Sequence, residues 1–247
     1  MPMRGKTAIL AVALMILCAV VIGGVTAQPP EESKDKVIHV SGTGKVTTTP
    51  DLAIIVLAVE TENADAKVAQ QQNAQKMDAV VSAIKDAGIP AKDIKTSGYS
   101  IIPVTEKNDK PLTITKTKYY RVVNTLEIRL SDIDRAGEII DLAVVSGANR
   151  VDWLSLTLSD AKQQEFRSEA LTAAVKQARG DADVVVAALG KAIIDVKEVN
   201  VGGSYAPMRY DSYNVAMEMA GGAPTPTPIE VGEIDVTASV SITYIIA

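Results

Sequence analysis

The sequence predicts an α+β protein with a mostly antiparallel sheet and three helices packed on one face. Three observations favour this class. Several strand-like segments alternate apolar and polar residues, which is typical of antiparallel strands with one dry face and one wet face. Three segments have helical periodicity, and each ends next to a glycine. Residues 52–59 are apolar on both sides, as expected for a strand in the middle of a sheet.

The first 27 residues predict an export signal. Arg4 and Lys6 precede an apolar run, residues 8–25, which is followed by the small residues that signal peptidase recognises. We expect cleavage after Ala27. The alternative is an uncleaved anchor, since about 18 apolar residues nearly span a bilayer. In that case residues 8–25 are the only expected membrane contact.

The mature chain is expected to contain no cysteine. Cys18 is the single cysteine of the sequence and lies within the export signal, so a disulfide or a thiolate metal site is excluded. Residues 28–36 are polar and predict a flexible spacer. A single domain is expected over residues 37–247. Its size is sufficient for a core, because chains of about 220 residues bury roughly 70% of their unfolded surface.

The charge of the chain argues against nucleic acid as a partner. After a cut at Ala27, 23 basic residues face 30 acidic ones, a formal charge of −7. Such a charge repels phosphate backbones, and the sequence has no basic cluster to overcome it. We therefore expect an exported protein of the periplasm, cell surface or extracellular space that does not bind nucleic acid.

The first half of the domain predicts four strands and one helix. Gly42 and Gly44 follow a short first strand and indicate that it ends there in a turn. The helix is expected over residues 64–87, with an apolar stripe at i, i+3, i+4 and i+7 and with Gly88 as its C-terminal cap. The strands expected in this half are residues 37–40, 52–59, 94–103 and 119–130.

The second half repeats the order helix, glycine, strand. Ser131 and Asp134 have the spacing of an acidic capping box for a helix that ends at Gly147. A third helix is expected over residues 161–189 and ends at Gly190. The strands expected in this half are residues 151–159, 193–201 and 233–246, the last with clean alternation of apolar and polar residues.

The domain also resembles the SIMPL domain family, a domain-of-unknown-function family that includes a periplasmic immunogenic protein. The similar segments keep the family's order over about 200 residues. They are Val40 to Gly44, Pro50-Asp51, Gly88-Ile89, Asp93 to Thr96, Tyr120 to Val122, Asp134 to Asp141, Gly147 to Asn149 and Pro226 to Glu233. The resemblance implies an exported α+β protein that assembles into ring- or channel-like oligomers, with loose associations with stress tolerance and signalling. It implies no reaction, cofactor or catalytic residue.

The residues themselves predict no catalytic, cofactor-binding or metal site. His39 is the only histidine and lies in an N-terminal strand, whereas catalytic triads and most zinc sites need a histidine with specific partners, so we expect it on the surface or at a strand edge. The segment Gly42-Thr-Gly-Lys45 departs from the phosphate-loop pattern, because His39 replaces the first glycine and Val46 the final Ser or Thr. We interpret it as a turn between two strands.

Two features predict an interaction surface. Trp153 alternates with core leucines and is expected on the other face of its strand, covered either by a loop or by another subunit. Residues 202–228 form a long segment rich in Tyr, Met and Pro, for which we consider both disorder and partner binding. The residues that would anchor a partner there are Tyr205, Met208, Tyr210, Tyr213, Met217 and Met219.

Three functional hypotheses follow. The first is a cell-envelope protein without catalytic activity that forms a homo-oligomer and has a structural, stress-related or interaction role. The alternative is a monomeric envelope module that binds a ligand under residues 204–222 as a lid. A second alternative is a carboxylate-dependent hydrolase. Its two carboxyl groups would lie about 5–9 Å apart, but one Trp and one Phe supply few sugar platforms.

Overall fold

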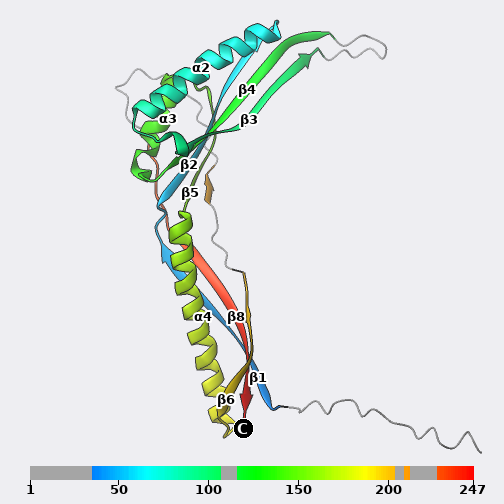
Figure 1. The fold of residues 1–247 in the computed structure, drawn as a ribbon, viewed down its shortest axis with the longest axis vertical. Helices are drawn as coiled ribbons and strands as arrows, with labels where there is room; N and C mark the ends of the chain where they lie inside the picture. The colour runs from blue at the N-terminus through cyan, green and yellow to red at the C-terminus, as the bar shows by residue number, and fades with distance from the viewer. Residues whose placement is uncertain (1–34, 107–115, 204–208, 212–226) are drawn as a thin grey trace, which may run out of the picture. The chain divides into compact units, whose positions relative to one another are not determined.

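Two antiparallel sheets and three helices make up the described part of the domain (Figure 1). The computed structural model describes residues 35–106, 116–203, 209–211 and 227–247, with the backbone alone for 209–211. The α+β class and the antiparallel pairing are confirmed. The strands are divided between two sheets, however, so that two helices pack on the larger sheet and one on the smaller.

The larger sheet has the order β3-β4-β2-β5-β7. The central strand of this sheet is β2, and the apolar residues 52–59 predicted this position. Ile55 and Leu57 of β2 are fully buried. Helices α2 (Ala66–Asp86) and α3 (Ala136–Val145) belong to the core on one face of this sheet. The strands are β2 (Leu52–Asn63), β3 (Ile94–Thr105), β4 (Thr117–Leu130), β5 (Arg150–Thr157) and β7 (Arg209–Asp211).

The ends of α2 follow local rules. The Asp65 carboxylate caps its N-terminus by accepting the amides of Lys67 and Val68, and Gly88 after its C-terminus has a φ of +92°. Only glycine adopts that conformation at little cost. Gly147 and Gly190 follow the other two helices, also with positive φ, so the predicted helix–glycine–strand pattern is confirmed.

The predicted capping box of α3 is wrong. A single 3-10 turn, η2 (Ile133–Arg135), precedes the helix, and another, η1 (Ala91–Asp93), precedes β3. Asp132 is the N-cap residue of η2 and Arg135 that of α3, and neither makes a side-chain capping bond. A capping box needs Ser131 at the N-cap position and Asp134 at the N3 position of the same α-helix. Because the 3-10 turn comes first, α3 begins after Asp134, and neither residue occupies the position that the box requires.

The smaller sheet has the order β1-β8-β6 and is covered on one face by α4 (Figure 1). The apolar alternation of β8 is confirmed, since its six apolar side chains from Ile234 to Tyr244 are all buried. The elements are β1 (Val37–Thr48), α4 (Asp160–Ala188), β6 (Ile193–Val201) and β8 (Ile234–Ile246).

The prediction of a turn at residues 42–45 is wrong, because β1 continues through both glycines. A Cβ at Gly42 would lie 2.0 Å from the backbone oxygen of Ala174, and one at Gly44 would lie 1.9 Å from that of Ala170. Both helix residues are alanines of the buried stripe of α4. The glycines therefore permit close contact between a strand and a helix and do not form a turn.

Asp51 joins two connections through which the chain passes between the sheets. Its carboxylate accepts the amide of Ser159 at 2.6 Å and the hydroxyl of Ser159 at 2.7 Å. Asp51 lies between β1 and β2, and Ser159 is the N-cap residue of α4, which follows β5. Asp51, which belongs to one of the segments that carry the family resemblance, thus holds the N-cap residue of α4.

Candidate functional site

Trp153 lies on the face of the larger sheet opposite α2 and α3. It pairs with Val56 of β2 and is 44% exposed, whereas the neighbouring Leu154 and Leu156 are buried in the core under the helices. The expected orientation of Trp153 is therefore confirmed. Its role as an interaction residue remains a prediction.

The surroundings of Trp153 are only partly polar. Val56 beside it is buried, and so is Ser155 two residues further along β5. The Ser155 hydroxyl has no hydrogen-bond partner within the described part of the chain. A tryptophan next to buried apolar side chains on a strand face is typical of a contact surface, because its large ring excludes water there.

Charged residues at one end of this face pair with one another across three strands. Glu60 of β2 lies 2.8 Å from Arg121 of β4 and 3.0 Å from Arg150 of β5. A hydrogen bond with Glu62, and next the charge of Glu60, raise the pKa of Arg121, whose guanidinium is exposed. The pKa of Arg150 is raised chiefly by its bond with Asp152. These ion pairs connect β2 with β4 on one side and with β5 on the other.

The predicted Tyr/Met surface lies almost entirely outside the described residues. This holds for Tyr205, Met208, Tyr213, Met217 and Met219. Tyr210 belongs to β7, and its backbone pairs with Ser155 of β5. One segment of the predicted loop is therefore a strand beside the one that carries Trp153, which the loop-like composition did not indicate.

Asp141 of α3 fixes the chain just beyond this segment. Its carboxylate accepts the Thr227 amide at 3.0 Å and the Thr227 hydroxyl at 2.7 Å. A Cβ at Gly137, one helical turn earlier, would lie 2.1 Å from the Thr227 oxygen, so residue 227 lies directly against the helix. Ile229 then packs at the edge of the main core.

We expect Asp141→Ala to lower the free energy of unfolding by about 2 kcal/mol, because two charge-assisted hydrogen bonds are lost at a partly buried site. Urea unfolding followed by circular dichroism measures this value. The control is Asp134→Ala, an exposed carboxylate of η2, for which a change below about 0.5 kcal/mol is expected. Equal losses in the two variants would show that Asp141 does not hold Thr227.

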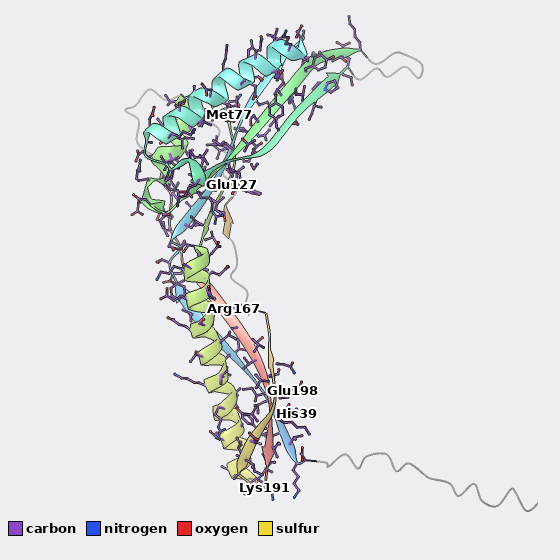
Figure 2. All side chains as sticks on the ribbon, viewed as in Figure 1. His39, Met77, Glu127, Arg167, Lys191 and Glu198 are labelled. Carbon is purple, nitrogen blue, oxygen red and sulfur yellow. The ribbon has the colours of Figure 1, made fainter. Side chains whose placement is uncertain are left out.

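The other candidate residues do not form a site. His39 lies on the edge strand β1, is exposed, and places Nδ1 2.9 Å from the Thr243 hydroxyl (Figure 2). Within residues 35–106, 116–203 and 227–247, the structure contains no group of three or more His, Cys, Asp or Glu side chains able to hold a metal ion. None of the helices described there is long and apolar enough to cross a membrane.

Sequence reasoning missed two exposed apolar edges. On β3, Tyr99, Ile101 and Ile102 are exposed, and on β6 the exposed side chains are Ile194, Val196, Val199 and Val201. Both segments were expected to be strands, but not to be edges. The irregular alternation of β6 was the available signal, since it indicates the β-bulges that the structure contains.

Comparison with known proteins gives a consistent result. A family model described as SIMPL, protein of unknown function (DUF541), matches residues 38–244. The chain is 30% identical over 214 residues to a 26 kDa periplasmic immunogenic protein of Brucella melitensis biotype 1, covering 84% of this chain and 83% of the relative. It is 29% identical over 160 residues to the uncharacterized protein YggE of Escherichia coli K12, 64% of each chain. YggE of Edwardsiella ictaluri is 28% identical over 189 residues, 75% of each chain.

Proposed function

Because this chain belongs to the SIMPL family, we propose that it is an exported envelope protein that acts by self-association and not by catalysis. The observation that carries the proposal is the exposure of aliphatic side chains on two edge strands, β3 and β6. Edge strands present unpaired backbone groups, and natural proteins usually cover or charge them. Exposed apolar edges are therefore expected to pair with another chain.

The composition of the described surface supports a role without catalysis. The charged groups around Glu60 are engaged with one another, and Lys95 of β3 lies 3.2 Å from Glu127 of β4. An acid–base mechanism needs groups with shifted pKa values that face a substrate. The hydrogen bond with Arg135 lowers the pKa of Glu138, as expected for a carboxylate held in an ion pair.

Export is supported by two independent observations. One relative is named as a periplasmic protein. In addition, the basic residues, apolar run and small residues of positions 1–27 have the order of a signal peptide.

The test is the mass of the exported protein at micromolar concentration, measured by light scattering and native mass spectrometry. The protein is produced with its own N-terminal segment, so that the measurement also reports whether residues 1–27 are removed. We expect a mass of at least twice the chain mass. A strict monomer would overturn the proposal, as would turnover of a substrate that is lost when one carboxylate is neutralised.

A further inference from the structure

The apolar face of the smaller sheet extends beyond the helix that covers it. On β8, Val240, Ile242 and Tyr244 are at most 3% exposed under α4. Their neighbours on β6 lie on the same face but are about half exposed, because α4 packs on β1 and β8 and hardly contacts β6. These neighbours are Val201 at 57%, Val199 at 49% and Val196 at 46%.

The opposite edge of the same sheet is protected. β1 lies tightly against α4 at Gly42 and Gly44, and the Thr43 amide donates to the side-chain oxygen of Gln177 on that helix at 2.9 Å. A helix side chain thus satisfies an outward backbone group of β1. Covering an edge with a helix is a common protection against strand addition. Within the described part of the chain, β6 is the edge of this sheet that carries an uncovered apolar face.

Two bulges give β6 its pattern. The pairing with β8 skips Ile194 and Lys197, so that Val196, Val199 and Val201 all point to the α4 side. Asp195, Glu198 and Asn200 point to the other side. Bulges often disrupt an edge. In β6 the two bulges place the three valines on one face and the two acidic residues on the other. Figure 2 labels Glu198, one of these acidic residues.

When two copies of β6 are placed antiparallel to each other, the side chains that come to lie opposite each other match in polarity and charge. A second β6 can be placed antiparallel to the first, with a twofold axis between Lys197 and Glu198. Val196 and Val199 then lie opposite each other on the α4 side, and Asp195 and Asn200 lie opposite each other on the other side, as antiparallel pairing requires. In this register Val196 faces Val199, Ile194 faces Val201, Asp195 faces Asn200 and Lys197 faces Glu198 of the other copy. Apolar residues meet apolar ones, and each lysine meets a glutamate.

We propose that β6 is the strand through which two copies of this chain pair, giving a continuous six-stranded sheet of order β1-β8-β6-β6-β8-β1. The twofold axis is perpendicular to the sheet, so both copies of α4 lie on the same face and flank the paired valines. This inference rests on the proposed self-association and specifies the surface and register of one of its contacts.

Charge reversal tests the register. Lys197→Glu places glutamate opposite Glu198, and Glu198→Lys places lysine opposite Lys197, twice in each pair of copies. Because like charges directly opposite destabilise strand pairing, each single variant is expected to weaken the two-copy step about tenfold. The double variant restores opposite charges and is expected to return to wild-type affinity. Sedimentation equilibrium measures the dissociation constant of the two-copy step for each single variant and for the double variant. Each protein is the exported chain, produced with its own N-terminal segment.

Cysteine cross-linking tests the same register without a change in charge. In a chain with Cys18→Ser, the pair Val196→Cys and Val199→Cys is expected to give a covalent dimer on a non-reducing gel. The matched control is Val196→Cys with Val201→Cys, whose thiols are not opposite each other and lie about 7 Å or more apart. Equal cross-linking in the two variants would overturn the register.

The possible results separate this inference from the proposed function. If the wild-type chain is a strict monomer, both fail. If it assembles, but the single charge reversals leave its mass unchanged or the double variant does not restore it, the β6 contact fails and self-association stands. If the single variants weaken assembly and the double variant restores it, the β6 contact is supported.

Discussion

Alanine in place of Gly42 is expected to lower the free energy of unfolding by about 3 kcal/mol, the upper end of the usual cost of overpacking. The new Cβ would lie 2.0 Å from the Ala174 oxygen and 2.7 Å from the Ala178 nitrogen. Both are backbone atoms of α4 and cannot rotate away. The helix would have to move off β1, and the packing of its alanine stripe against the smaller sheet would be lost. Gly44→Ala is expected to behave in the same way against Ala170.

The control for this prediction is Gly180→Ala in the same helix. A Cβ at Gly180 would have no atom within 4 Å, so the change should raise the free energy of unfolding by up to about 1 kcal/mol through helix propensity. Denaturant unfolding followed by circular dichroism compares the variants. A Gly42→Ala protein as stable as the wild type would show that α4 and β1 are not in close contact.

The elements that sequence reasoning predicted correctly are those decided by neighbouring residues. The end of α2 depends on Gly88, and the buried face of β8 depends on simple alternation from Ile234 to Tyr244. The same alternation predicted that Trp153 lies on the face away from the leucines. These features need no knowledge of distant partners.

The features that could not be predicted depend on residues far apart in the sequence. Gly42 was interpreted as part of a turn, because a glycine that permits close contact looks the same locally as one that forms a turn. The helix that it contacts begins more than 100 residues later. The exposure of Val199 depends on bulges relative to β8 and on the reach of α4. Alternation of apolar and polar residues likewise shows which face of a strand is buried. It does not show to which of the two sheets the strand belongs.

Asn73 is a residue that sequence reasoning missed although a signal existed. It lies in a polar run of α2, but it is also spaced by four residues from Ala69 and from Met77 on the buried stripe. A polar residue on such a stripe must find hydrogen-bond partners. Asn73 is fully buried, and its Nδ2 donates to the carbonyl oxygens of Val59 at 2.8 Å and of Val122 at 3.2 Å. It therefore joins α2 to two strands at once.

We expect Asn73→Asp to lower the free energy of unfolding by about 4 kcal/mol at pH 7, because a buried carboxylate would replace the donor and face two carbonyl oxygens. Asn73→Leu has a similar volume and no charge, so a smaller loss of about 2 kcal/mol is expected from the strand carbonyls that lose a donor. Denaturant unfolding of both variants at pH 7 measures the difference.

The dependence on pH distinguishes a buried charge from a packing defect. Burial favours the neutral form of the introduced carboxyl group, so its pKa in the folded state is raised above the unfolded value of about 4. The folded state then binds more protons between the two pKa values, and the stability of Asn73→Asp falls as the pH rises through that window. Below about pH 4 the charge penalty disappears, and the Asp variant should approach the Leu variant in stability. If the two variants differed by the same amount at pH 4 and pH 7, position 73 would not lie in a dry contact between α2 and the sheet.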